Sequence, residues 1–390
     1  MQITKVSAVV CNAEMRNWVF VRVETDVPGL VGWGEATLEW KTRAVTGAIA
    51  DIEPLLIGQD PRNIEQCYQI MTRHGFWRMG VIGMSAISGI EIALWDILGK
   101  SLDTPVWRLL GGQVRDHLRT YTHLGMGNMT SVYETDGAQE LAERGRAVVD
   151  AGYSAVKVVA IPYAHYIASN RAIDGVGEAI DALRSEVGPD IDIMVDFHGR
   201  PASASLAREF LKVLEPSRIL FAEEPVPPEN VDAMAELTRT SPVTIAGGER
   251  LIGRAGFDTA LKAGAFHIAQ PDIVHVGGLW EAKKIAAMCE TAGIGVAPHN
   301  PLGPIAGIAA LHFGVSTPNH IIQEEMVGAV PWYDSVVKWP IDKVAGRWDL
   351  PEKPGLGLEV DEAEVAAHPF QQEVLHTRNA VLPDGTIVDW

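Results

Sequence analysis

Hydrophobic residues along the chain follow two different spacings. Near the beginning, the segments TKVSAVV, WVFVRVET and GLVGWGEA alternate between apolar and polar positions, which is typical of antiparallel strands. In the later segment MSAISGIEIALWDILGK, Ile87, Ile90, Leu94 and Ile97 recur three and four residues apart, the spacing of a buried helical stripe. The beginning of the chain is therefore predicted to be an α+β unit.

From about Leu118 the pattern changes to short apolar runs separated by amphipathic segments such as SASLAREFLKVL. The runs are rich in Val, Ile and Ala, as strands of a parallel sheet covered on both faces require. The eight predicted strands are LRTYTHLG, SAVKVVA, IDIMVDF, ILFAEEP, PVTIAGGE, FHIAQPD, IGVAPH and IIQEE. This alternation predicts an α/β fold with a TIM-like (β/α) barrel. A doubly wound sheet is the alternative, but no G-x-G-x-x-G or G-x-x-x-x-G-K-[ST] segment follows a strand.

The last part of the chain, from PEKPGLGLEVDE onward, is again rich in Pro and Gly and strand-like. We expect this tail to leave the barrel and rejoin the first unit. The predicted division is therefore residues 1–117 together with 352–390 in one domain, and residues 118–351 in the barrel.

Composition and charge limit the classes of molecule that the protein is expected to bind. The 390 residues are 47% hydrophobic and 21% charged, as in a globular protein, and the formal net charge of -18 repels nucleic acid and anionic membranes. Three widely spaced cysteines, Cys11, Cys67 and Cys289, indicate neither a disulfide framework nor a zinc ribbon. With no signal-like first segment and no apolar run of membrane-spanning length, we expect a cytoplasmic protein, a homo-oligomer without nucleic-acid or membrane partners.

Polar side chains stand where the predicted barrel strands end. In a (β/α) barrel these ends open on one face, where the active sites of such enzymes lie. Each of these acids alone is more often a helix N-cap or an ion-pair partner, but acids on consecutive strands enter one space. In the order of the strands, the residues are Asp196, Glu223, Glu249, Asp272, His299 and Glu324.

Crowded carboxylates need a cation, because each one disfavours the ionisation of the next and burial adds to that cost. Asp196, Glu223 and Glu249 would offer only oxygen ligands, which suit Mg²⁺. No Cys or His belongs to this set, so zinc is disfavoured. The adjacent Glu224 should face away from Glu223 by strand alternation.

Two histidines accompany these acids. His299 would be paired with Asp272, and a carboxylate beside an imidazole is how a general base is built. His198 lies two residues after Asp196, and residues two apart on a strand point the same way, so we expect it to project toward whatever the metal holds. A structural role for each histidine is the alternative.

Several segments in this order resemble the enolase superfamily, within it the mandelate racemase group, and there the D-galactonate dehydratases. The segments that carry the resemblance are DFHGR, AEEPV, AGGERL, QPD, APHNPLGPIA and IIQEE, with VGWGEA, LIGQDP, ALWDILGK, PVWRLLGG and KPGLGLEVDE extending it over nearly the whole chain. The resemblance implies an α+β capping domain, formed by both chain ends, over a (β/α)7β barrel.

The resemblance also implies a reaction, the Mg²⁺-dependent dehydration of an acid sugar such as D-galactonate to a 2-keto-3-deoxy acid through an enediolate. It places Mg²⁺ on Asp196, Glu223 and Glu249, makes His299 with Asp272 the base that takes the proton beside the carboxylate, and makes His198 the acid that protonates the departing 3-hydroxyl. Glu324 would be a neighbouring acid near the enediolate. An epimerase or cycloisomerase of another sugar acid, or a catalytically silent sugar-acid-binding protein, remains the alternative.

The sequence departs from the family in two segments, and it says less about which residues contact the substrate. Mandelate racemase-like members carry K-x-K on the second barrel strand, whereas VKVVA has Lys157 followed by Val159 in the second lysine position, which disfavours a two-base racemase. The next segment, IPYAHYIASNRA, does not resemble the galactonate enzymes. Residues that combine charge or an aromatic ring with a place near the predicted mouth are the candidates for substrate contact: Arg16, Trp18, Trp77, Arg78, Lys157 and Tyr163.

Overall fold

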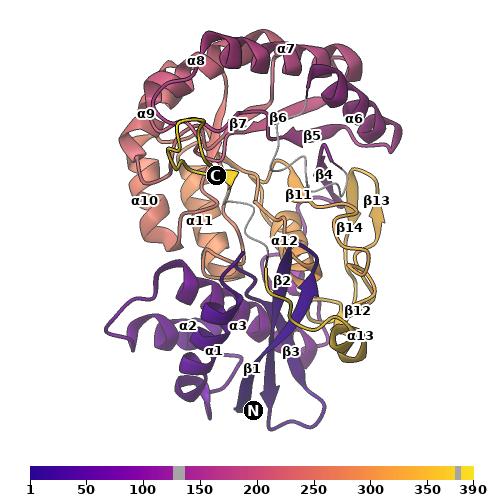
Figure 1. Ribbon diagram of the computed structural model, residues 1–390. Helices are drawn as coiled ribbons and strands as arrows, with labels where there is room; N and C mark the ends of the chain where they lie inside the picture. Colours follow the sequence, from indigo (N-terminus) through magenta and orange to yellow (C-terminus); the bar gives the residue numbers. More distant parts are fainter. Residues whose placement is uncertain (126–136, 374–378) are drawn as a thin grey trace.

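The computed structural model describes residues 1–125, 137–373 and 379–390. Its first unit is a three-stranded antiparallel sheet in the order β1-β2-β3, covered by helices (Figure 1). The elements are β1 (Ile3–Ala13), β2 (Arg16–Thr25), β3 (Val31–Glu35), α1 (Thr42–Leu56), α2 (Ile64–Arg73), α3 (Gly80–Ser101) and the short α4 (Val106–Leu109). The predicted α+β unit is therefore present.

Glycines allow α3 to lie directly on β3. A Cβ atom added to Gly34 would meet the carbonyl oxygen of Gly89 at 1.8 Å, and one added to Gly32 would meet the carbonyl oxygen of Ala93 at 2.2 Å. Only a residue without a side chain fits such an approach. The glycines of VGWGEA and of ISGIEIA thus set the distance between sheet and helix.

The expectation that no apolar run reaches membrane-spanning length was wrong for α3. This 22-residue helix is long and apolar enough by length and composition, with a mean hydropathy of 1.6 over its most apolar window. Of that window, 78% is buried inside the protein, so α3 is a core helix. Apolarity on all sides reflects burial between the sheet and the barrel.

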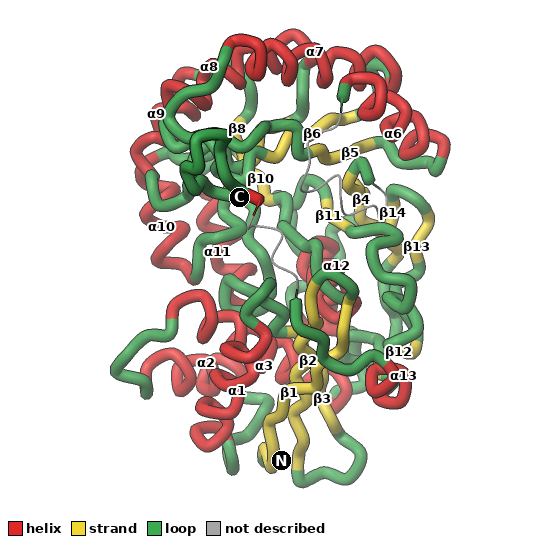
Figure 2. The backbone as a smooth tube through the Cα atoms, viewed as in Figure 1, coloured by secondary structure: helices red, strands yellow, loops and turns green. Residues whose placement is uncertain are grey.

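The barrel prediction is confirmed. Within the described residues, eight parallel strands alternate with seven helices, and Figures 1 and 2 show α6 to α10 on the outside of the strands. The strands are β4 (His117–His123), β5 (Ala155–Val158), β6 (Asp192–Asp196), β7 (Phe221–Glu223), β8 (Ile245–Gly247), β9 (Ile268–Ala269), β10 (Gly295–Val296) and β11 (Gln323–Glu325). The intervening helices are α6 (Ala138–Asp150), α7 (Asn170–Val187), α8 (Ala204–Leu214), α9 (Val231–Thr240), α10 (Gly253–Ala263), α11 (Leu279–Thr291) and α12 (Pro304–Val315), and a 3-10 turn, η1, covers Glu215–Ser217.

Backbone hydrogen bonds close the strands into a ring. β4 to β10 pair in chain order, and β11 returns to pair with β4 in parallel. Between the two remaining neighbours, the N–H of Ile321 donates to the carbonyl of Val296 at 2.8 Å, and the N–H of Val296 donates to that of Asn319 at 2.8 Å. The carboxyl ends of all eight strands therefore surround one opening.

A separate small core fills the inside of the ring. Each strand, or the residue beside it, contributes one side chain to this layer: Tyr121, Ala155, Met194, Phe221, Ala246, Ile268, Ala297 and Ile322. All are buried. The barrel interior is thus packed, and open space is restricted to the strand ends above it.

The rest of the chain after β11 runs back along both units. It contains β12 (Val337–Lys338), β13 (Lys343–Val344), β14 (Arg347–Asp349), β15 (Glu359–Val360) and α13 (Glu362–Ala367). β14 pairs antiparallel with β4, whereas the N–H of Asn12 in β1 donates to the carbonyl of His368 at 2.8 Å. Part of the tail therefore lies beside the first unit, and residues 374–378 of the predicted 352–390 return are outside the described residues.

Two buried carboxylates join the first unit to the barrel. Glu35, at the end of β3, accepts hydrogen bonds from the backbone N–H groups of Gly303 and Ala306 at 2.8 Å each, at the beginning of α12. Glu91 of α3 accepts from the N–H groups of Leu279 (2.8 Å) and Trp280 (2.9 Å), at the beginning of α11. Both acids satisfy helix N–H groups that have no partner within their own helix.

Candidate active site

The strand ends bring five of the predicted residues around one cavity of about 450 Å³, which we call the polar cavity: Asp196, His198, Glu249, His299 and Glu324. Glu223 and Asp272 contact it through Lys157 and His299. Asp196 and Glu223 are direct neighbours in the register of β6 and β7, and Glu249 follows two residues after β8. The side chains that line the cavity come from the barrel mouth and from the first unit, and they include Arg16, Glu39, Trp40, His123, Lys157, Asp196, His198, Glu249, His275, His299, Glu324 and Trp390.

Lys157 of β5 lies at the centre of the acids. Its Nζ is 2.7 Å from Oε1 of Glu324, 3.0 Å from Oε2 of Glu223 and 3.4 Å from Oδ2 of Asp196. Burial disfavours the charged amine, but Glu223, Glu324 and Asp196 outweigh it and raise the pKa of Lys157 well above its ordinary value. Lys157 therefore holds Glu324, Glu223 and Asp196 together and offsets part of their charge.

His198 faces Asp196, although not for the reason expected from strand alternation. β6 ends at Asp196, and His198 has a φ of +52°, in the left-handed region that L residues adopt rarely. Its Nε2 lies 3.2 Å from Oδ2 of Asp196, and its backbone N–H donates to Oδ1 at 2.9 Å. Burial opposes ionisation of Asp196, but His198 and Lys157 hold its pKa well below the ordinary range. A strained turn, which is frequent at functional sites, thus places the imidazole.

His299 is held between two carboxylates on the other side of the mouth. Its Nδ1 lies 2.7 Å from Oδ2 of Asp272, and its Nε2 lies 3.3 Å from Oε2 of Glu249. Burial opposes the charged imidazole, but Glu249, Glu324 and Asp272 outweigh it and raise its pKa well above the ordinary value. Asp272 fixes the orientation of the ring, and the Nε2 edge faces the cavity side.

The carboxylate of Glu324 is fixed by two groups besides its ion pair with Lys157. Its Oε1 lies 2.8 Å from Nε2 of His123, and its Oε2 accepts from the N–H of Asn300 at 2.8 Å. Burial opposes ionisation, and Lys157, His299 and His123 hold its pKa well below the ordinary value. Glu324 is therefore ionised, and His123 is the donor in their contact.

The three proposed metal ligands do not converge on one point. Within residues 1–125, 137–373 and 379–390, no three His, Cys, Asp or Glu side chains form a ready group for a metal. Their oxygens instead face Lys157, His198 and His299. By chemistry the residues fit Mg²⁺. Asp196 and Glu223 are buried at the ends of adjacent strands, and Glu249 is partly buried just beyond β8. Burial, followed by the charge of Asp196, raises the pKa of Glu223 to about 7, and a divalent cation would offset this cost.

Two of the six candidates for substrate contact line the polar cavity, Arg16 and Lys157. Arg16 is buried, forms an ion pair with Glu39 and donates to the carbonyl of Pro301 at 2.9 Å. Trp18 instead belongs to the core of the first unit, where its ring centroid lies 5.6 Å from that of Tyr333.

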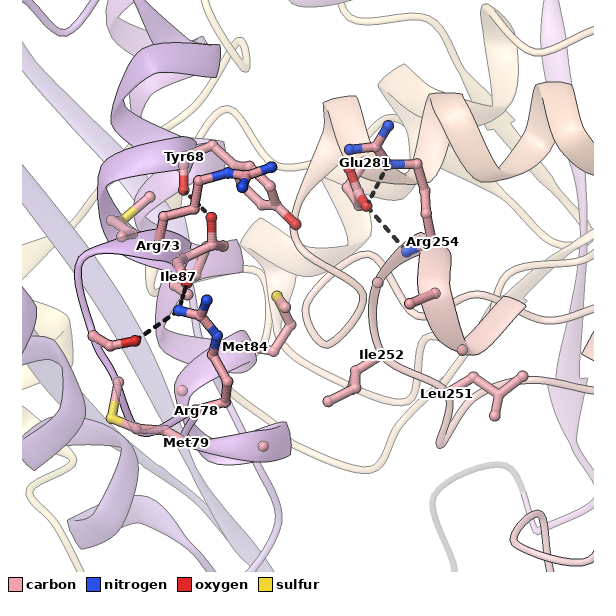
Figure 3. A pocket seen from close by; sticks show the side chains of 18 of the residues that line it. Tyr68, Arg73, Arg78, Met79, Met84, Ile87, Leu251, Ile252, Arg254 and Glu281 are labelled. Carbon is pink, nitrogen blue, oxygen red and sulfur yellow. Dashed lines mark hydrogen bonds and ion pairs between the residues drawn. The ribbon is translucent and has the colours of Figure 1, made fainter. Parts of the chain in front are cut away.

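The other three candidates lie elsewhere. The ring of Tyr163 lies 4.5 Å from the guanidinium carbon of Arg200. Trp77 and Arg78 line a different, larger cavity of about 960 Å³ between α2, α3 and the start of α10. Figure 3 shows this cavity, where Arg78 lies across from Leu251 and Ile252, and Arg254 contacts Glu281. None of the strand-end acids lines this cavity, so Trp77 and Arg78 do not lie at the predicted active site.

Four residues at the cavity were not foreseen from the sequence. His123 ends β4, and its position at a strand end is a signal that could have found it. His275 connects the two units, because its Nδ1 lies 2.9 Å from Oγ of Ser85 in α3 and its Nε2 lies 3.8 Å from Oδ2 of Asp272. Trp40 and Trp390 come from segments without a periodic pattern, so no sequence signal indicates them.

The sequence and the fold are those of a known class of protein. The mandelate racemase/muconate lactonizing enzyme N-terminal domain family matches residues 4–111, and the enolase C-terminal domain-like family matches residues 140–364. The chain therefore belongs to the mandelate racemase/muconate lactonizing enzyme family of the enolase superfamily.

Individual relatives are similar over nearly their whole length. The D-galactonate dehydratase of Cronobacter sakazakii is 39% identical over 381 residues, 96% of each chain. Among solved structures, a mandelate racemase/muconate lactonizing enzyme-like protein from Roseovarius sp. TM1035 is 34% identical, with a TM-score of 0.88 over 96% of this chain and 97% of the other. A member of the enolase superfamily from Salmonella Typhimurium is 30% identical, with a TM-score of 0.88 over 94% of this chain and 98% of the other.

Proposed function

We propose that this protein is a hydro-lyase that dehydrates an acid sugar, an aldonate, to a 2-keto-3-deoxy acid, with D-galactonate as the first substrate to test. The observation that carries the proposal is the pair of histidines at one cavity, each held by its own carboxylate. His198 contacts Asp196, and His299 contacts Asp272. Dehydration of a carbon acid needs a base and a separate acid. The D-galactonate dehydratase of Cronobacter sakazakii, 39% identical, supports this reaction class.

In the proposed reaction His299 takes the proton from C2, beside the substrate carboxylate. The C–H electron pair moves into the substrate and gives an enediolate. His198 then gives a proton to the 3-hydroxyl, which leaves as water while the C2–C3 double bond forms, and the resulting enol tautomerises to the 2-keto acid. Asp272 holds the imidazole of His299 in place, and Lys157 keeps Glu324 ionised and fixed beside the reacting carbons.

Asp196, Glu223 and Glu249 are the residues that would hold Mg²⁺. When bound, the ion would supply positive charge that offsets the three acids and the negative charge developing on the substrate. Support for this assignment comes from their placement on the ends of β6, β7 and beyond β8, and from burial, which raises the pKa of Glu249 to about 7 against the opposing effect of His299.

Aldonic and aldaric acids, screened for 2-keto acid formation, test the proposal. With Mg²⁺ present we expect D-galactonate or a close stereoisomer to give a product that condenses with semicarbazide. An epimerase or cycloisomerase would convert a sugar acid without giving such a product. A silent binding protein would convert none, although a substrate would still raise its melting temperature. Val159, in the position of the second lysine of K-x-K, disfavours a two-base racemase.

The proposal also covers the domain boundaries, the oligomeric state and the location of the protein. We assign residues 1–117 and 352–390 to the capping domain and residues 118–351 to the catalytic barrel, and we expect a homo-oligomer in the cytoplasm without nucleic-acid or membrane partners. The three cysteines are buried and not joined by disulfides, which is consistent with a reducing compartment.

A further inference from the structure

Trp390, the last residue of the sequence, lies at the mouth of the polar cavity. Its ring centroid is 4.8 Å from that of His198, with 35° between the ring planes. It is also 5.0 Å from the ring of Trp40, in an edge-to-face arrangement at 76°. Figure 1 shows the chain end beside the barrel strands rather than beside the N-terminal sheet. The indole thus lies between the imidazole of His198 and a loop of the first unit.

A local turn holds this part of the tail. Val381 and Ile387 form an antiparallel bridge, and the N–H of Val388 donates to the carbonyl of Ala380 at 3.0 Å. Inside the turn, the N–H of Thr386 donates to Oδ1 of Asp384 at 3.0 Å. The position of the indole therefore depends on a small hydrogen-bonded unit of the tail.

His198 depends on packing because one edge of its ring has no hydrogen bond. Its Nε2 faces Asp196 at 3.2 Å, whereas among the described residues no group hydrogen-bonds to the buried Nδ1. A single contact leaves the ring free to tilt, and a reacting group displaced by about 1 Å loses roughly a hundredfold in rate. The indole of Trp390, tilted by 35° against the imidazole, is an aromatic contact in addition to the contact with Asp196.

We propose that Trp390 is a positioning residue for the elimination step. Its indole packs on His198 and, together with Trp40, keeps the imidazole aimed at the departing hydroxyl and water away from it. The assignment rests on the proposed dehydratase function and on the role of His198 in it. It predicts that Trp390 affects the departure of the hydroxyl but not the removal of the C2 proton, which His299 performs at the other side of the mouth.

The test compares wild type, Trp390→Ala and Trp390→Phe with Mg²⁺ and the substrate found in the screen, in D₂O. Proton NMR follows two rates, formation of the 2-keto acid and appearance of deuterium at C2 of recovered substrate. In Trp390→Ala we expect kcat for dehydration to fall about tenfold or more while C2 exchange continues, so that exchange per product rises. Trp390→Phe should regain most of the rate, since a flat ring returns. Trp339→Ala, at a half-exposed tryptophan beside Lys353, is the matched control and should match wild type.

If the wild type dehydrates, three results would overturn the role of Trp390 but leave the proposed function standing. The first is a Trp390→Ala variant with unchanged rates, and the second is a parallel fall of exchange and dehydration, which indicates a general structural role. The third is a raised KM at unchanged kcat, which indicates a contact with the substrate only. Thermal unfolding of each variant separates loss of fold from loss of positioning. A wild type that forms no 2-keto acid from any sugar acid would instead overturn the proposed function, and the role of Trp390 with it.

Discussion

Two groups of buried carboxylates in this molecule, one at the interface of the two units and one at the barrel mouth, differ in their partners. At the interface of the two units, Glu35 and Glu91 accept from backbone N–H groups at the beginnings of α12 and α11. At the barrel mouth, Asp196 and Glu223 face Lys157 and His198. Backbone donors are fixed in place by the fold, whereas side-chain cations can turn away and be replaced by another cation.

The pKa values alone would not distinguish these regions. Burial raises the pKa of Glu35 and that of Glu91 to about 7, and it does the same for Glu223 at the mouth. A perturbed carboxyl is therefore a sign of burial first, and the nature of its partners decides whether it serves structure or chemistry. On this basis we expect the interface acids to govern stability and the mouth residues to govern activity.

The largest expected effect is the loss of catalysis on removing the base. His299→Asn should lose both dehydration and C2 deuterium exchange by about a thousandfold or more, because general-base catalysis contributes about 10²–10⁴ and His299 is the proposed acceptor of the C2 proton. His198→Asn should lose dehydration but still exchange the C2 proton. Proton NMR in D₂O measures both. Exchange by the His299 variant and none by the His198 variant would reverse the roles of base and acid.

Metal removal should also abolish activity while leaving the fold intact. Exhaustive EDTA treatment is expected to stop dehydration, and Mg²⁺ to restore it, because the mouth acids exchange their side-chain partners for the ion. Glu249→Gln should need more Mg²⁺ for half-maximal rate, since it removes one charge from the ligand set. Titration of activity against Mg²⁺ measures this, with the exposed Glu352→Gln as control. Full activity without metal would contradict the assignment of Asp196, Glu223 and Glu249.

The opposite result is expected at the interface. Glu35→Gln places an amide N–H₂ against the N–H groups of Gly303 and Ala306, so at least one buried donor loses its partner. We expect a loss of about 3 kcal/mol in the free energy of unfolding, because an unsatisfied buried group facing a former charge costs about that much. Urea denaturation measures it. An unfolding free energy equal to that of Glu352→Gln would show that the interface acids are not structural.

The smallest effect is a pH dependence of stability at the same interface. Burial lowers the pKa of His312 in α12 to about 4, and its Nδ1 accepts from the N–H of Trp107 at 3.0 Å. In the unfolded chain this histidine takes up its proton near pH 6.5. Between pH 6.5 and 4 the unfolded state therefore binds more protons, and stability falls as the pH falls.

Comparison with His312→Gln isolates this contribution, because other buried acids titrate in the same range with the opposite sign. The stability difference between wild type and variant should shrink by about 2 kcal/mol from pH 8 to pH 5, which follows from a shift of roughly 2.5 pKa units. Urea unfolding at the two pH values measures it. A pH-independent difference would show that the pKa of His312 is the same in the folded and the unfolded state.

The barrel and most of its polar mouth could be predicted from sequence because the signals are local. Eight apolar runs give eight strands, and the acid or histidine after each run lies at the strand end in any (β/α) barrel. His123 ended one of these runs and was overlooked, although the same rule applies to it. The glycines of VGWGEA, in contrast, took on meaning only when Gly34 was seen to lie against Gly89.

What escaped prediction depends on contacts between distant segments. The contact of Ser85 with His275 joins residues 190 positions apart, and Trp390 reaches His198 through a turn without periodicity. The substrate candidates show the reverse error. Trp77 combines aromatic character with a neighbouring cation, but its side chain is 84% exposed and belongs to another cavity, because residue type alone does not say which side of a loop faces the site.

The packed layer inside the barrel also limits the routes by which substrate and product can reach and leave the site. Tyr121, Met194, Phe221 and Ile322 belong to the buried layer that fills the ring beneath the acids. Substrate and products of the proposed reaction would therefore pass through the side of the cavity that the first unit and the tail line, with Trp40 and Trp390 among the lining residues. The residues that line this entrance would therefore influence how quickly product leaves as well as which substrate is admitted. The slowest step of the cycle can then be product release rather than the chemistry.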